Sequence, residues 1–186
     1  MVIMTGMDEV SVVTFLKKVS QALRADGVFV AIKTLEEARE RGSMVYLMGN
    51  GGSAATASHF ANDLTKVCAI RAVAISDLMA LVLAYGNDDG WQNMFAHALK
   101  VYRKPGDVLV VFSCSGYSGN VLEAAKMWYP DDDIIAFTGN DRESKLSTKV
   151  QLSALVTVDD PDIMVQESVH LAVCHAIVSS LKESLL

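Results

Sequence analysis

Four titratable side chains in two predicted helices have the types and spacing to hold a metal ion or to move protons. His59 and Asp63 are four residues apart, which places them on one face of a helix, where two side chains can share one ion. Spacing alone equally fits a hydrogen-bonded His–Asp pair on a helix surface. Glu167 and His175 lie in a second, otherwise apolar helix, where a charge is costly unless it is paired or used.

The helical angle favours Glu167 over its neighbour Gln166 as the companion of His175. At 3.6 residues per turn, Glu167 and His175 differ by about 80° around the helix, whereas Gln166 and His175 lie on opposite faces. Two turns separate Glu167 from His175, a rise of roughly 12 Å. A shared ion therefore requires both side chains to reach toward it, or one of them to come from a neighbouring subunit. We expect the remaining histidines, His97 and His170, to be structural.

A glycine-rich turn precedes the helix of His59 and Asp63. The apolar run 44–48 leads into Gly49-Asn50-Gly51-Gly52-Ser53, and an alanine-rich, helix-forming segment follows. Glycines let the backbone approach an anion closely, and the first N–H groups of the helix then point at it. The hydroxyl of Ser53 adds a further donor. Many such turns only connect two elements, so this turn alone is weak evidence for a phosphate site.

A second turn of similar chemistry follows the apolar run 108–112. It contains the serines Ser113, Ser115 and Ser118 and the glycines Gly116 and Gly119. Hydroxyls and backbone N–H groups can bind a phosphate without Lys or Arg, and a helix beginning near Ser118 adds its dipole. A serine-rich helix N-cap is the structural alternative. Two such turns in one chain favour a sugar-phosphate ligand.

The hydropathy pattern predicts an α/β fold. Strand-like runs occur at 44–48, 69–75, 108–112, 134–137 and 154–158, and helical segments separate most of them. Because these runs are continuously apolar, we expect a largely parallel sheet covered on both faces, with binding at the carboxyl ends of its strands. Two amphipathic helices, 8–23 and 28–38, precede the first strand, and a long helix from about 162 to 185 closes the chain. The leading pair either packs on its own sheet or forms a subunit interface.

Composition narrows the classes of function. The chain has 186 residues, of which 51% are hydrophobic, which fits one domain with a substantial core. A net charge of −6 without a basic cluster argues against nucleic-acid binding. Cys68, Cys114 and Cys174 are an odd number without C-x-x-C spacing, which favours a reducing compartment. Without a leader-like start or a run of about 18 apolar residues, we expect a soluble, cytoplasmic protein that contacts no membrane.

Four blocks, in order, resemble the sugar isomerase (SIS) domain family. They are GNGGSAATASHFANDL, the GND of residues 86–88, SCSGYSGNVLEAA, and the E-x-x-H-x-x-x-x-H of Glu167, His170 and His175. The resemblance covers nearly the whole chain and implies a single SIS domain, 1–186. It implies a three-layer α/β sandwich with a five-stranded parallel sheet, and usually a homotetramer with active sites between subunits. Within the family it is strongest to isomerases that convert sedoheptulose 7-phosphate to D-glycero-D-manno-heptose 7-phosphate.

The resemblance also assigns roles to residues. It places the phosphate at the second turn and the sugar at the first turn and at an Asn-Asp pair, so that the expected substrate contacts are Asn50, Gly51, Gly52, Ser53, Asn87, Asp88, Ser113, Cys114, Ser115 and Ser118. One zinc ion per site is expected on His59, Asp63, Glu167 and His175. In the enediol mechanism of such enzymes, Asp63 or Glu167 abstracts a proton and His175 is its acid/base partner.

The chain departs from the family pattern at several of these positions. Asp63 stands where the best-known members carry glutamate, and Glu167 stands where they carry glutamine, so that Gln166 remains an alternative. Cys114 and Tyr117 replace the usual threonine and asparagine of the phosphate turn. A non-catalytic SIS module that senses phosphosugars or binds a protein partner is the alternative function. A dinucleotide-binding oxidoreductase is disfavoured, because the turn lacks the full G-x-G-x-x-G fingerprint.

Overall fold

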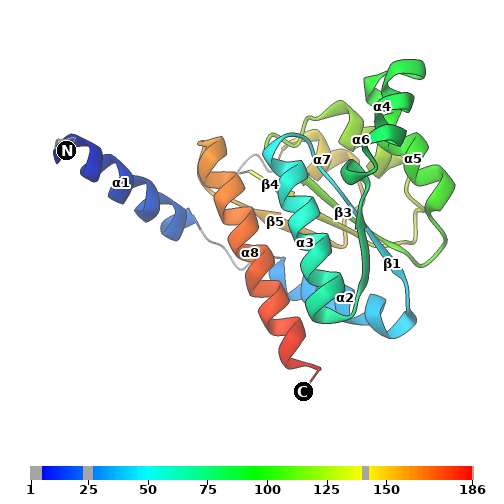
Figure 1. Ribbon diagram of the computed structural model, residues 1–186, viewed down its shortest axis with the longest axis horizontal. Coiled ribbons are helices and arrows are strands. Elements are labelled where there is room, and N and C mark those ends of the chain that lie inside the picture. The colour runs from blue at the N-terminus through cyan, green and yellow to red at the C-terminus, as the bar shows by residue number, and fades with distance from the viewer. Residues whose placement is uncertain (1–5, 23–26, 140–142, 186) are drawn as a thin grey trace.

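The five strands form one parallel sheet in the order β2-β1-β3-β4-β5 (Figure 1). The computed structural model describes residues 6–22, 27–139 and 143–185. The strands are β1 (Met44–Met48), β2 (Arg71–Ala74), β3 (Val108–Ser113), β4 (Ile134–Thr138) and β5 (Ala154–Thr157). The predicted five-stranded parallel sheet is confirmed. Strand β2 is shorter than the predicted 69–75, because Ala69 adopts a left-handed conformation after a helix and Ile75 begins a 3-10 turn.

Helices cover both faces of this sheet. One apolar core contains buried residues of α1 (Gly6–Ala22), α2 (Val28–Arg41), α3 (Gly52–Cys68) and α8 (Ile163–Glu183). A second core contains those of α4 (Met79–Asp88), α5 (Met94–Tyr102), α6 (Gly119–Lys126) and α7 (Lys145–Lys149). Two 3-10 turns, η1 (Ile75–Asp77) and η2 (Trp91–Asn93), flank α4. The architecture is therefore the predicted three-layer α/β sandwich.

Strand β3 shows why the sheet strands are continuously apolar. Val108, Val110 and Phe112 pack into the first core. Leu109 and Val111, which alternate with them, pack into the second. Because successive side chains of a strand point to opposite faces, a strand covered by helices on both sides needs apolar residues at every position.

The leading helix α1 is only partly packed. Phe15 and Val19 contact the first core, whereas Val12 and Leu16 are 55% and 60% exposed. The far end of α1 projects away from the rest of the molecule (Figure 1). Leu23, which the pattern placed on the same stripe, lies outside the described residues. The apolar stripe of α1 thus leaves a surface that a second chain could cover.

The closing helix α8 carries its apolar stripe into the core. Its N-cap residue Asp162 accepts a hydrogen bond from the backbone N–H of Met164 at 2.9 Å, which fixes where the helix begins. Val165, Val169 and Ile177 are fully buried, as their helical spacing predicted. Among the described helices, α8 is the one whose length and hydropathy would suffice to cross a membrane, a test that the core helix of a soluble protein also passes.

The strand register brings the two glycine- and serine-rich turns together. Met48, the last residue of β1, is opposite Val111 of β3, so both strands end at the same edge of the sheet. From β1 the chain leads to β2 on one side and, later, to β3 on the other. This is the point where strand order reverses, and in open α/β sheets ligands bind in the crevice at that point.

Candidate active site

The side chains of His59, Asp63 and His175 converge between α3 and α8. The Nε2 atom of His59 lies 2.9 Å from Nε2 of His175 and 3.2 Å from Oδ2 of Asp63. The distance from Nε2 of His175 to the same Asp63 oxygen is 3.9 Å. All three ligand atoms lie within 4.8 Å of one another, so one ion could contact them together.

Two helices on the same face of the sheet create this convergence. His59 and Asp63 lie one turn apart on α3, and α8 runs beside α3 and contributes His175 (Figure 1). The imidazoles are about half exposed, whereas Asp63 is mostly covered. Two imidazole nitrogens and one carboxylate oxygen form a donor set that suits zinc, and three protein ligands leave a further position for water or substrate. The residues present therefore fit the expected ion.

Glu167 lies near this group but outside it. The group of atoms that could share one ion does not include its carboxylate. Instead the carboxylate of Glu167 lies against Gly52, the first residue of α3, and it lines a cavity of about 400 Å³ together with His59 and Thr56. Its charge also acts on the nearby thiol of Cys114. Glu167 thus faces a cavity that it shares with Gly52 of the first turn and with His59, one of the three residues His59, Asp63 and His175 that we call the metal-type group.

The structure separates the roles of Gln166 and Glu167. The Nε2 atom of Gln166 donates to the backbone oxygen of Asp160 at 2.7 Å, and the side chain is buried beside Gly139. Gln166 is therefore held in the interior, whereas Glu167 lines the cavity, and Glu167 as the companion of His175 stays a prediction. His170 is also buried, and its Nε2 lies 3.1 Å from the backbone oxygen of Thr138. Burial lowers the pKa of His170 to about 4, so its imidazole is neutral at pH 7.

The serine-rich turn joins β3 to α6. Ser113 donates its hydroxyl to the Ser118 oxygen at 3.2 Å, and the Ser115 oxygen accepts from the backbone N–H of Tyr117 at 3.2 Å. Gly116 has a φ of +67°, which favours glycine, and a Cβ there would overlap Ser144. Helix α6 begins at Gly119, beside Ser118 as predicted, and Ser118 is its N-cap residue. The turn therefore offers hydroxyls and a helix start to one ligand group.

Cys114 lies in the middle of this turn. Its Sγ atom is 3.9 Å from the Oγ of Ser53 in the first turn. Burial raises the pKa of the Cys114 thiol, its interaction with the Ser53 hydroxyl opposes that shift, and the negative charge of Glu167 adds to it. The thiol is therefore protonated at neutral pH and places no negative charge beside an anion.

Asn87 and Asp88 lie in a different layer of the fold from His59 and His175. They end α4, which belongs to the opposite helical layer, and both are exposed. The Nδ2 of Asn87 donates to Oδ1 of Asp88 at 2.7 Å. Their exposure leaves them available to a ligand or to a neighbouring chain.

Sequence reasoning missed one polar residue that links the two turns. Asn120, in the first turn of α6, is fully buried and forms two hydrogen bonds with Asn50. Its place directly after the serine-rich turn was visible in the sequence, but its burial was not.

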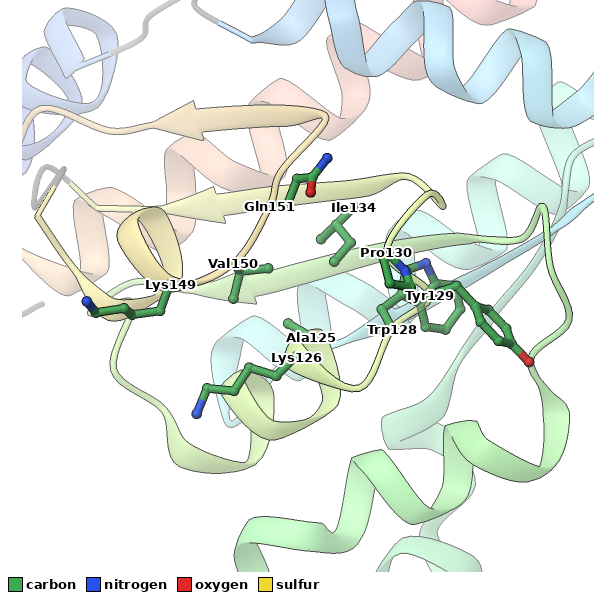
Figure 2. A pocket seen from close by; sticks show the side chains of 9 residues that line it. All are labelled: Ala125, Lys126, Trp128, Tyr129, Pro130, Ile134, Lys149, Val150 and Gln151. Atoms are coloured by element: carbon green, nitrogen blue, oxygen red, sulfur yellow. The ribbon is translucent and has the colours of Figure 1, made fainter.

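A second cavity, of about 210 Å³, lies beside the amino end of β4 (Figure 2). Its lining residues are Ala125, Lys126, Trp128, Tyr129, Pro130, Ile134, Lys149, Val150 and Gln151. Among these described residues there is no histidine and no carboxylate. The cavity also lies at the edge of the sheet away from the carboxyl ends of the strands, so we do not assign the chemistry to it.

Comparisons with known proteins find relatives over most of this chain. A sequence profile of the SIS domain matches residues 10–139. A phosphoheptose isomerase from Neisseria meningitidis is 34% identical over 144 residues, which cover 74% of this chain and 73% of that protein. One from Shewanella is 31% identical over 157 residues, covering 77% and 76% of the two chains. The structure of a phosphoheptose isomerase from Neisseria gonorrhoeae superposes with a TM-score of 0.84 at 28% identity, covering 96% of this chain and all of that one.

Proposed function

Because the chain belongs to the SIS domain family and is a sugar-phosphate isomerase, we propose that it converts sedoheptulose 7-phosphate to D-glycero-D-manno-heptose 7-phosphate. One observation supports the proposal that the isomerisation takes place at this site. The Glu167 carboxylate faces a cavity that it shares with His59 of the metal-type group and with Gly52 of the first turn, and its charge acts on Cys114 of the second turn. A base, a group of metal-type ligands and a phosphate-binding turn are the parts that an aldose–ketose isomerisation of a phosphorylated sugar requires.

We assign the proton abstraction to Glu167. The reaction moves a proton from C1 of the ketose to C2 of the aldose through an enediol, so it requires a base beside these carbons. Asp63, the other candidate, has its Oδ2 atom 3.2 Å from Nε2 of His59 and shares the metal-type group. Glu167 lies outside that group and faces the cavity. His175 is the proposed acid/base partner.

A zinc ion fits this arrangement as the cofactor, one per site. His59, Asp63 and His175 would hold it, and when bound it would supply a positive charge for the oxyanion that develops on the substrate. The sequence-based assignment also included Glu167 as a ligand, and the position of its carboxylate against Gly52 favours the role of base instead.

The proposed substrate contacts follow the two turns. We place the phosphate at Ser113, Cys114, Ser115 and Ser118, and the sugar at Asn50, Gly51, Gly52, Ser53, Asn87 and Asp88. Support comes from the start of α6 at Gly119 and from the neutral thiol of Cys114, which does not repel a phosphate dianion.

We further propose a cytoplasmic homotetramer in which each chain is a single SIS domain, 1–186, and in which sites form between subunits. The exposed apolar side chains Val12 and Leu16 of α1 support a subunit contact. The position of Asn87 and Asp88 in the layer opposite α8 supports their use by a neighbouring subunit.

The test is turnover of sedoheptulose 7-phosphate in D2O with and without added zinc, followed by NMR and mass spectrometry. We expect an aldoheptose 7-phosphate with deuterium at C2. Glu167→Gln should lower kcat by roughly 10²- to 10⁴-fold while zinc binding remains. Glu123→Gln, which removes a surface carboxylate paired with Lys126, is the matched control and should retain wild-type kcat. Phosphosugar binding without turnover or exchange would instead indicate a non-catalytic sensor.

A further inference from the structure

Asn50 and Asn120 exchange two hydrogen bonds although 70 positions separate them. The Nδ2 atom of each side chain donates to Oδ1 of the other, and both distances are 2.9 Å. Two antiparallel hydrogen bonds between the side-chain amides fix both the separation and the orientation of the two amides, whereas a single hydrogen bond would leave their orientation free. We call these two residues the asparagine pair.

The asparagine pair joins the two turns of the candidate site. Asn50 belongs to the turn that leads into α3, and Asn120 belongs to the first turn of α6, directly behind the serine-rich turn. Ser53 and Cys114 approach each other at the same junction, with 3.9 Å between Oγ and Sγ. The start of the helix that carries the metal-type ligands is thereby tied to the turn proposed to bind phosphate.

Burial and charge distinguish the asparagine pair from an ordinary surface contact. Asn120 has 0% of its surface exposed, so any effect of this residue on a ligand is indirect. Its Oδ1 atom also accepts from the backbone N–H of Val121 at 3.0 Å, which anchors it to α6. Both amides are uncharged, so they join the two turns without placing a carboxylate beside a phosphate dianion.

We infer that the asparagine pair sets the distance between the phosphate turn and the metal-type group, and that Asn120, acting through Asn50, is a positioning residue for a sugar phosphate that spans both. The inference rests on the proposed function in one respect, namely that one ligand contacts both places. When one ligand is held at two points, the second contact is effectively intramolecular, and its strength depends on the geometry between the points. A sugar phosphate that is held at one end alone gains nothing from that geometry.

Three probes separate positioning from general support of the fold. Inorganic phosphate tests the serine-rich turn, zinc tests the group of His59, Asp63 and His175, and sedoheptulose 7-phosphate tests both together. In Asn50→Ala and Asn120→Ala we expect phosphate and zinc affinities within about twofold of wild type. The kcat for the heptose should fall by roughly 10- to 100-fold, with a smaller change in KM, because the reacting carbons are misplaced relative to the base.

The double variant Asn50→Ala/Asn120→Ala tests whether the two side chains act as a unit. It should lose no more activity than either single variant, since the first substitution already breaks the pair. Asn120→Leu keeps the approximate size of the buried side chain, carries no charge and loses both hydrogen-bonding groups, so it serves where alanine does not fold. Thr34→Ala removes a buried polar side chain of α2, outside both turns, and should retain wild-type kcat.

Hydrogen exchange tests the same inference without any sugar. Asn120→Ala should speed amide exchange in residues 49–53, and Asn50→Ala should speed it in residues 115–121, while the β4 amides stay protected. The inference is overturned if exchange in the opposite turn is unchanged, if all three ligands weaken together, or if the two single losses add. If the wild-type protein does not turn over the heptose but the two variants show the cross-turn exchange effect, the proposed substrate is contradicted and the coupling between the two turns stands.

Discussion

The carboxylate of Glu167, in α8, lies directly against Gly52, the first residue of α3. A Cβ atom at Gly52 would overlap both carboxylate oxygens, whereas a Cβ at the preceding Gly51 would meet open space. The two glycines are therefore required for different reasons. Gly51 has a φ of +54°, which favours glycine, while Gly52 is not among the glycines with positive φ and makes room for the proposed base.

Gly52→Ala should impair catalysis by moving Glu167. Because the carboxylate must shift to admit the new methyl group, we expect kcat to fall by roughly 100-fold, the effect of a displacement of about 1 Å. In the background of Glu167→Ala, which removes the colliding carboxylate, Gly52→Ala should cost little further activity. Steady-state kinetics of the two single variants and the double variant test this coupling, and losses that simply multiply would contradict it.

His59→Ala and His175→Ala should each remove a ligand of the proposed zinc ion. We expect zinc affinity to fall by more than the roughly 10- to 100-fold loss that follows from removing a residue that only supports a ligand. His97→Ala is the matched control, since His97 lies on α5 and pairs with Asp89 instead. Titration calorimetry with zinc on the purified variants gives the comparison. Equal zinc affinity in all three variants would exclude this group as the metal site.

The periodicity of the sequence predicted the elements well, because both faces of the sheet are covered. Strand β1 occupies 44–48 as predicted, since an apolar run between Gly42 and the glycine turn has no other place to pack. The sequence pattern did not predict how α1 packs. The pattern placed Val12 and Val19 on one stripe, but whether a stripe packs on its own domain or remains exposed depends on tertiary structure.

For the site, helical spacing predicted that His59 and Asp63 share one face of their helix. In the closing helix, it predicted that Glu167 lies nearer than Gln166 to the face of His175. The spacing within one helix cannot say which other helix lies next to it, so the meeting of His175 with His59 became visible only through the packing of α8 on α3. The expectation that Glu167 is a zinc ligand came from the resemblance to the SIS family, and it stays a prediction beside the proposed role as base. The distance of Glu167 from Gly52 is a relationship between two helices that neither helix pattern contains.

Acidification should destabilise the fold through His170. Burial lowers the pKa of His170 to about 4, from an ordinary value near 6.5 in the unfolded chain. Between these values the unfolded state binds a proton that the folded state excludes, so the stability present above pH 6.5 is lost as the pH falls toward 4. One pKa unit corresponds to 1.36 kcal/mol, so the free energy of unfolding should fall by about 2 kcal/mol between pH 7 and pH 5 from this group.

Urea unfolding at pH 7, 6 and 5 in the presence of a metal chelator measures this effect. His170→Gln retains an N–H group that can donate to the Thr138 oxygen but cannot be protonated, so its stability should fall less steeply with acidification than that of wild type. His97→Gln leaves the buried imidazole in place and should retain the wild-type slope. If wild type and His170→Gln lose stability in parallel, the buried histidine is not the cause.

Leu16→Glu should weaken the proposed tetramer without unfolding the subunit. Leu16 is 60% exposed on α1, so its replacement removes little packing within one chain. If α1 packs against a second subunit, the substitution places a charge in an apolar contact, where burial of an unpaired carboxylate is strongly unfavourable. Light scattering coupled to size exclusion should then report smaller assemblies, with the far-UV circular dichroism of the subunit unchanged.

Lys17→Glu introduces the same side chain at the neighbouring exposed position, off the apolar stripe, and should leave the assembly intact. Identical masses for wild type and Leu16→Glu would place the subunit contact elsewhere than this stripe of α1.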